Sequence, residues 1–251
     1  MFRLMLGFLL PFFGTVLGSA VVFFVKDKLN PKFEQVLLGL AGGMMMSASI
    51  WSLIIPALEQ EQNLKNMPWL PATIGFVFGV IFLLMVELWS NKYDNKLKGK
   101  KTGNMLLAIT IHNIPEGMAV GVALAGAYYG NEILTLASAV SLAVGIAIQN
   151  FPDGAIVSLP LFADGRSKSK SFWIGVMSGV LELVCAVIAF FLTELLTPIL
   201  PYILSFAGGA TIFVVVKDLI PSSQSGQYTN WATISFAVGF LLMMLLDVCI
   251  V

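Results

Sequence analysis

The sequence predicts an all-helical integral membrane protein, and three observations support this fold class. Hydrophobic residues make up 58% of the 251 residues, charged residues make up 11%, and the mean hydropathy is +0.90. Apolar runs of about 20 residues, enough for a helix to cross a bilayer, recur along the chain. Basic residues collect in alternate connections between these runs. A soluble globular domain is only about half apolar, so the composition argues against that class.

Eight apolar runs are expected to form eight transmembrane helices in one domain, residues 1–251. Their approximate bounds are 4–25, 33–56, 69–89, 104–127, 132–160, 171–194, 199–222 and 229–250. The first run follows Arg3 as in a signal peptide, but it continues without a charge to Lys26, so we expect a retained helix. Only LTPILP separates the sixth and seventh runs, and its two prolines suit a tight turn.

The distribution of lysine and arginine predicts the orientation in the membrane. Eleven of the fourteen basic residues fall in the first, third and fifth connections: Lys26, Lys28, Lys32, Lys92, Lys96, Lys98, Lys100, Lys101, Arg166, Lys168 and Lys170. Connections rich in these residues stay in the cytoplasm, so both termini should lie outside. The formal net charge is zero. We therefore expect the lipid bilayer as a partner and no nucleic acid.

Two six-residue segments in the fourth and fifth runs share one pattern. HNIPEG covers residues 112–117 and contains the only histidine of the chain, and QNFPDG covers residues 149–154. Residues three or four apart share one face of a helix, so the polar members of each segment should converge. The converging side chains are His112, Asn113 and Glu116 in the first segment and Gln149, Asn150 and Asp153 in the second.

The prolines and carboxylates of these segments favour a functional interpretation. Pro115 and Pro152 have no N–H for the carbonyl four residues earlier, so each should kink its helix and expose a backbone oxygen. An unpaired carboxylate at the bilayer centre costs about 3 kcal/mol on insertion scales and usually lines a pathway or meets an opposite charge. A divalent cation would supply that charge. The alternative is that the polar side chains only form hydrogen bonds in the core and that the prolines are ordinary kinks. This alternative could explain a single motif, but it explains less well why a second motif lies at the same depth in the next helix.

The available ligands indicate which ions to expect. Imidazole with carboxylate and amide oxygens, and without thiolate, suits Zn²⁺, Cd²⁺, Fe²⁺ or Mn²⁺ better than Cu⁺. Four Cys or His ligands would normally close a structural zinc site, whereas an oxygen-rich site should bind modestly and release its ion. The sequence therefore predicts transport of divalent metal cations, Zn²⁺ foremost, without a catalytic cofactor.

Five further charged residues lie within or beside the apolar runs. Glu182, in the middle of the sixth run, is expected to have a functional role. Lys217 either snorkels to the surface or pairs with Asp218 or Glu182. Glu87 is either an exit-side acid or a solvated interfacial residue, and Asp247 is similarly ambiguous. Glu87, Lys217 and Asp218 are therefore candidate pathway residues or charge partners.

Sulfur-containing residues predict packing rather than metal binding. Met44, Met45 and Met46 are consecutive, so they point in three directions on a helix. Cys185 and Cys249 each lie in an apolar run, which suggests neither a disulfide framework nor a thiolate cluster.

The paired motifs resemble those of the ZIP (Zrt/Irt-like) family of divalent metal transporters. Many members of the family have histidine at the position of Gln149, and the glutamine there makes the chain similar to the bacterial GufA-like branch. The similarity extends to SGVLE in the sixth run and IFVVVKDLIP in the seventh. It implies a 3+2+3 bundle with inverted pseudosymmetry between the outer triplets, in a bacterial inner membrane. It also implies ion movement toward the cytoplasm through an elevator-like motion of the two central helices.

The resemblance further implies a site for two ions. One ion would be held by His112, Glu116, Gln149 and Asp153. Its neighbour would be held by Asn113, Glu116, Asn150, Asp153 and Glu182.

Three residues depart from the pattern of the family. Asp153 is one methylene shorter than the common glutamate, and Asn150 stands where some relatives have a carboxylate. Lys217 stands where an acid is frequent, so its ammonium group could replace one cation. The third connection, histidine-rich in many relatives, has no histidine here.

Two other classes of function are compatible with a polar cluster in a helical bundle. An intramembrane metalloenzyme would need a second histidine and a general base, as in HExxH, so we expect no enzyme. In a structural or receptor-like bundle the cluster would only form hydrogen bonds between helices. That role does not explain why a proline and a carboxylate occur at matched positions in both motifs. The physiological metal, the number of ions, proton coupling and the oligomeric state, a homodimer included, stay open.

Overall fold

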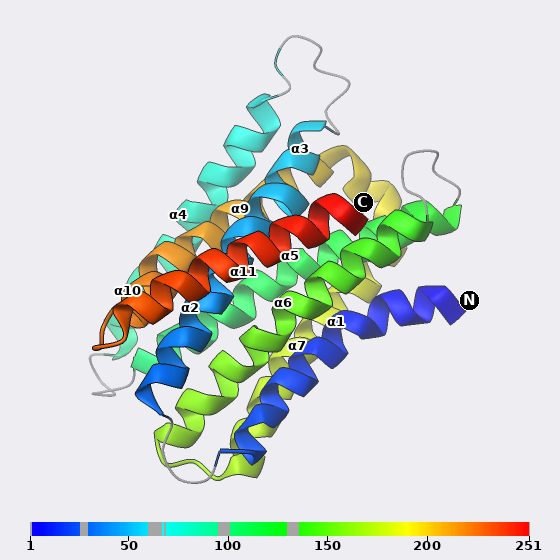
Figure 1. The fold of residues 1–251 in the computed structure, drawn as a ribbon. Helices are drawn as coiled ribbons and strands as arrows, with labels where there is room; N and C mark the ends of the chain where they lie inside the picture. The colour runs from blue at the N-terminus through cyan, green and yellow to red at the C-terminus, as the bar shows by residue number, and fades with distance from the viewer. Residues whose placement is uncertain are drawn as a thin grey trace.

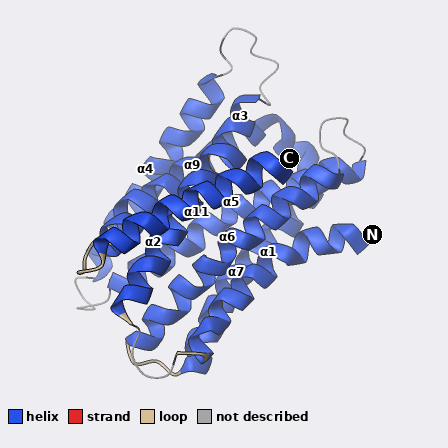
Figure 2. Ribbon diagram, in the orientation of Figure 1, coloured by secondary structure: helices blue, strands red, loops and turns tan. Residues whose placement is uncertain are grey.

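The computed structural model describes residues 2–25, 30–59, 67, 69–94, 101–129 and 136–250. Every regular element in those ranges is helical (Figure 2). Seven helical stretches within them are long and apolar enough to cross a membrane, in agreement with an all-helical integral membrane protein. The remaining predicted run, 104–127, lies within helix α5, and part of its side chains fall outside the described residues.

The helices follow the predicted runs with small shifts at their ends. In chain order they are α1 (Phe2–Ala20), η1 (Val21–Phe23), α2 (Pro31–Ala48), η2 (Ser49–Ile54), α3 (Ile55–Glu59), α4 (Trp69–Asp94), α5 (Lys101–Tyr129), α6 (Leu136–Ala163), α7 (Lys168–Phe191), α8 (Thr193–Leu196), η3 (Thr197–Ile199), α9 (Leu200–Val214), η4 (Val215–Leu219), α10 (Ile220–Ser223) and α11 (Thr229–Ile250). The predicted turn around LTPILP contains the two short helices α8 and η3. Figure 1 shows both termini at the same end of the bundle, opposite the connection between α10 and α11.

Two membrane spans contain a π-helical segment, which the residue pattern did not predict. The segments are η2 and η4, and each lies between two α-helical pieces. A single residue separates each segment from a proline, Pro56 or Pro221. Proline lacks an N–H and its ring clashes with the carbonyl of the preceding turn, so a locally wider helix accommodates it. By contrast, α6 continues as an α-helix through Pro152.

The long helices pack into two groups. In the first group, α1 packs on α6 and α7, and α5 packs on α7. In the second group, α2 packs on α11, and α4 packs on α9. The two groups meet where α2 lies against α6 and where α5 lies against α9.

Glycines bring the helix backbones within each group into direct contact. A Cβ on Gly14 of α1 would overlap the carbonyl of Ala147 on α6. In the second group, a Cβ on Gly43 would overlap the carbonyl of Phe236 on α11. Lipid tails are as apolar as the helices, so close packing at small residues, rather than hydrophobic exclusion, holds such helices together.

Gly14→Ala should therefore lower the thermal stability of the protein in detergent. The added methyl group would meet backbone atoms that cannot move aside, and overpacking costs about 1–3 kcal/mol. Gly145→Ala on α6 is a matched control, because its Cβ would lie 3.3 Å from Met243 Cε, the mobile end of a side chain. Thermal unfolding followed by size-exclusion fluorescence measures both variants, and equal Tm values would contradict the direct contact of α1 with α6.

Candidate metal centre

The two sequence motifs lie on the neighbouring helices α5 and α6, and Glu182 lies on α7 beside them. The side chains of Glu116, Asp153 and Glu182 are only 1%, 3% and 1% exposed. Each carboxylate comes from a different helix of the first packing group. The bundle therefore buries three acidic side chains in its interior.

Amide side chains of the second motif bind carboxylates of two other helices. Gln149 Nε2 donates a hydrogen bond to Glu116 Oε1 of α5 at 2.8 Å. Asn150 Nδ2 donates a hydrogen bond to Glu182 Oε2 of α7 at 2.6 Å. Consecutive residues of a helix point about 100° apart, so one motif reaches α5 on one side and α7 on the other. The central helix α6 thus connects both acids.

The two asparagines make the same kind of bond in the two motifs. Asn113 Nδ2 donates to the main-chain carbonyl of Ser178 on α7 at 3.3 Å. Asn150 Nδ2 donates to the carbonyl of Pro11 on α1 at 3.1 Å. Each asparagine thereby fixes its helix to a flanking helix, and the repeat seen in the sequence is also a repeat of contacts.

The glycine that ends each motif allows this close approach. A Cβ on Gly117 would overlap the carbonyl of Glu182, and a Cβ on Gly154 would overlap the carbonyl of Thr15. Because no side chain separates the backbones there, short side chains such as asparagine can reach the next helix. Thr15, 1% exposed, thus lies beside the motif of α6 and was not among the predicted site residues.

Several oxygen atoms of the cluster have unused acceptor capacity. Among the described residues, Asn113 Oδ1, Gln149 Oε1, Asn150 Oδ1 and Glu182 Oε1 are buried without a hydrogen-bond donor. Buried polar atoms in native proteins are nearly always partnered, so four such oxygens in one cluster need an explanation. Carboxylate and amide oxygens are ligands of divalent cations, which offers one.

Two predicted features of the cluster fall outside what these contacts describe. His112 lies in α5, but its side chain is outside the described residues, so its part in the cluster stays a prediction. Within the described ranges, no group of three or more His, Cys, Asp or Glu side chains is arranged to hold a metal. Three of the seven predicted ligands are amides, namely Asn113, Gln149 and Asn150. The predicted site therefore does not consist only of His, Cys, Asp and Glu side chains.

Lys217 pairs with a residue that the sequence did not point to as its partner. Its Nζ lies 3.2 Å from Glu87 Oε1 on α4, whereas the sequence left two alternatives, snorkelling to the surface or pairing with Asp218 or Glu182. The side chain of Lys217 is 52% exposed and that of Glu87 is 24% exposed. The pairing arises because α4 packs on the span that contains η4, which the sequence alone does not reveal. An ion pair this exposed stabilises the fold by about 0–1 kcal/mol.

A second polar bridge involves Asp247, which the residue pattern left undecided. Ser52 Oγ, in the π segment η2, donates a hydrogen bond to Asp247 Oδ1 on α11 at 2.7 Å. Ser52 and Lys217 each lie four residues before the proline that follows a π segment, and Asp247 and Glu87 each lie eight residues after a glycine of their helix. These equal spacings are the signal that could have revealed both bridges.

Replacing Asn150 by leucine should destabilise the protein by about 1–3 kcal/mol, because Glu182 Oε2 would remain buried without its donor. Adding Glu182→Leu to that variant should recover part of the loss, since no carboxylate then remains to be paired. Thermal unfolding of the two single variants and the double variant gives the coupling energy. Strictly additive losses would show that the two side chains do not interact.

Named relatives match nearly the whole chain, although no family model matches it. Zinc transporter ZIP11 of Homo sapiens is 32% identical, over 98% of this chain and 97% of the relative. Zinc transporter GufA of Myxococcus xanthus is 31% identical, over 93% of this chain and 94% of the relative. Zinc transporter ZIPB of Bordetella bronchiseptica is 30% identical, over 94% and 77%. The paired motifs and these full-length similarities lead to one conclusion: the chain belongs to the ZIP (Zrt/Irt-like) family.

Proposed function

We propose that the chain transports divalent transition-metal cations across the cell membrane toward the cytoplasm. Zn²⁺ is the first candidate, and Cd²⁺, Fe²⁺ and Mn²⁺ are the others. The observation that carries the proposal is the burial of Glu116, Asp153 and Glu182, from three helices, among amide side chains. Acidic groups at this depth in a membrane protein are costly and typically serve an ion pathway. The relatives are named zinc transporters, which supports the same cargo.

The proposed ligands are those that the motifs predicted. His112, Glu116, Gln149 and Asp153 hold one ion, and Asn113, Glu116, Asn150, Asp153 and Glu182 hold its neighbour. The hydrogen bonds support this division, because each joins two members of one set: Gln149 with Glu116, and Asn150 with Glu182.

An arriving cation would compete with amide N–H groups for the carboxylates. The nitrogens of Gln149 and Asn150 bind Glu116 and Glu182, while the amide oxygens have no donor among the described residues. Rotation of a terminal amide by about 180° exchanges the positions of its nitrogen and its oxygen. The side chain that donates to the carboxylate can therefore become a ligand of the cation. The hydrogen bonds between amides and carboxylates stabilise the site when no ion is bound. Because these bonds can form again as the ion leaves, they favour its release.

The contacts support a 3+2+3 arrangement with inverted pseudosymmetry. The packing of α1 on α6 corresponds to that of α7 on α5, and the packing of α2 on α11 corresponds to that of α9 on α4. A Cβ on Gly43 would overlap the carbonyl of Phe236, and one on Gly209 would overlap that of Phe76. The bonds of the two asparagines follow the same correspondence. An elevator-like movement fits this division, because all proposed ligands lie in the group formed by α1, α5, α6 and α7.

Glu87, Lys217 and Asp218 are proposed as charged groups on the exit side. They lie toward the end of the bundle opposite the termini, which the lysine count assigns to the cytoplasm. The ammonium group of Lys217 already compensates Glu87 there. A fixed cation at this point would oppose the retention of a divalent ion and so promote its release.

Glu116→Gln should abolish saturable uptake of zinc and of cadmium into proteoliposomes. The substitution keeps the size of the side chain but removes the charge that both proposed ions share. His112→Ala should reduce uptake as well, because it removes the only imidazole. Glu194→Gln is the matched control, since Glu194 is an exposed glutamate of α8 outside the cluster.

Metal-dependent flux in the wild type and in the control, but not in the cluster variants, would distinguish transport from the other two classes of function. An intramembrane metalloenzyme or a structural bundle would give the same leak in all four proteins. That result would overturn the proposal, provided that each variant elutes as a folded protein.

The orientation can be tested with single cysteines in a background without Cys185 and Cys249. The exposed positions Asp164 and Ser225 lie in connections at one end of the bundle, and Glu194 lies at the other. An impermeant maleimide should label Glu194→Cys on intact spheroplasts, and should label Asp164→Cys and Ser225→Cys only after permeabilisation. The reverse pattern would place both termini in the cytoplasm and contradict the lysine rule.

A further inference from the structure

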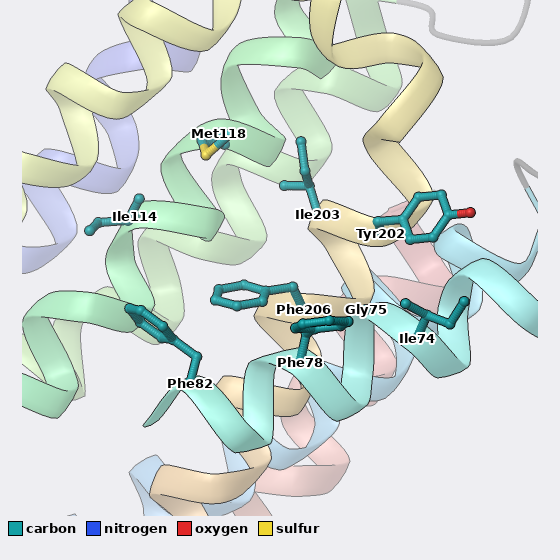
Figure 3. Close-up of a pocket in the computed structure, with 9 residues that line it drawn as sticks. All are labelled: Ile74, Gly75, Phe78, Phe82, Ile114, Met118, Tyr202, Ile203 and Phe206. Carbon is teal, nitrogen blue, oxygen red and sulfur yellow. The ribbon is translucent and has the colours of Figure 1, made fainter. Parts of the chain in front are cut away.

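An apolar pocket opens where the two packing groups meet. It has a volume of about 460 Å³ and lies between α4, α5 and α9 (Figure 3). Ile74, Phe78 and Phe82 of α4 form one wall, and Ile114 and Met118 of α5 form another. Figure 3 shows these side chains gathered around one space, with the hydroxyl of Tyr202 directed away from it. None of the labelled residues therefore directs a polar side-chain group into the pocket.

The pocket lies in the inner part of one leaflet of the bilayer and extends slightly past the bilayer midplane. Ile74 and Phe82 come five and thirteen residues after Trp69, at which α4 begins. At 1.5 Å per residue the pocket extends from about 7 to about 20 Å beyond Trp69. Trp69 is 52% exposed and marks a membrane interface, and one leaflet contributes about 15 Å of the hydrocarbon core. The pocket therefore faces acyl chains rather than headgroups or water.

The opening of the pocket is on the outer surface of the bundle. Phe78 is 64% exposed, and Ile74 and Phe82 are 36% and 38% exposed. In a membrane-spanning helix such side chains contact lipid. Apolar cavities do not retain water, and a polar ligand would lose its hydrogen bonds there. The volume of about 460 Å³ corresponds to only about one turn of an α-helix with its side chains, which is too little for a partner's transmembrane helix but enough for an unbranched chain.

We propose that this pocket binds one acyl chain of a phospholipid from the surrounding leaflet. The bound chain fills the space between the helix that carries Glu116 and the two helices of the other packing group. Ile114 and Met118 each lie two residues from Glu116 on α5, so the chain contacts the helix of the proposed ion site directly.

The bound acyl chain should also influence transport, and this part rests on the proposed function. A shift of α5 past α4 and α9 would change the shape of the pocket, because its walls come from both groups. An acyl chain that fits one position of the helices stabilises that position relative to others.

Photolabelling with a phosphatidylcholine that carries a diazirine in the middle of one acyl chain tests the binding. After irradiation of proteoliposomes, mass spectrometry should find adducts on α4, α5 and α9 around the pocket. Ile203→Trp, which fills the pocket, should remove most of this labelling. Ile203 also packs against buried residues, so Ile74→Trp at the mouth provides a second filling variant. Val238→Trp on the exposed face of α11 is the control and should leave the labelling unchanged.

Labelling of the pocket no stronger than that of the exposed face of α11, or labelling unaffected by both filling variants, would overturn the proposal. Cross-links between two copies of the chain at Phe78 would overturn it as well, because a second copy would then cover the pocket. Zinc uptake measured on the same vesicles tests the influence on transport: Ile74→Trp should change the rate relative to Val238→Trp, and equal rates would contradict that influence. Labelling does not require flux, so a failure of the transport proposal is distinguishable from a failure of lipid binding.

Discussion

A carboxylate buried among membrane-spanning helices needs a partner, and the centre of this protein is organised by that requirement. Gln149 binds Glu116 and Asn150 binds Glu182, so the middle helix α6 supplies a donor to each of its neighbours. Asparagine is short, and it can reach across only where the helix backbones touch. Gly117 provides that contact with α7 for Asn113, and Gly154 provides it with α1 for Asn150, because a side chain at either glycine would overlap the neighbouring helix. Acid, amide and glycine are therefore one structural unit, and the loss of any member weakens the others.

The same unit occurs twice, and the two copies differ where charge is concerned. Asn113 and Asn150 each bind a carbonyl of a flanking helix, on α7 and on α1. The carbonyl next to Gly117 belongs to Glu182, whereas the one next to Gly154 belongs to Thr15. The flanking helices thus add a third carboxylate on one side of the cluster and a hydroxyl on the other. The two copies therefore have the same backbone contacts but differ in the charge of the side chain that the flanking helix provides.

Unequal charges also distinguish the two polar bridges at the π segments. Ser52, a neutral hydroxyl, binds Asp247 on α11, and Lys217, a cation, pairs with Glu87 on α4. A π segment before a proline occurs in both spans, so the backbone provides the same irregularity at both ends of the bundle. The side chains placed on it give one end an acid held by a hydroxyl and the other end a compensated ion pair. A pathway between these ends would meet different electrostatic surroundings on entry and on exit.

The apolar runs, the repeated motif and the residues that could form the cluster were evident in the sequence alone, and within the described residues seven helical stretches are long and apolar enough to cross a membrane. These features are local: hydrophobic length fixes a span, and a spacing of three or four residues fixes a helix face. Gln149 and Asn150 could be named for that reason, although which carboxylate each would bind could not. The folded structure was needed to find that Gln149 pairs with Glu116, that Lys217 pairs with Glu87, and that an apolar pocket opens beside α5. Those outcomes depend on how closely distant helices cross, and crossing distances are set by packing at many residues together.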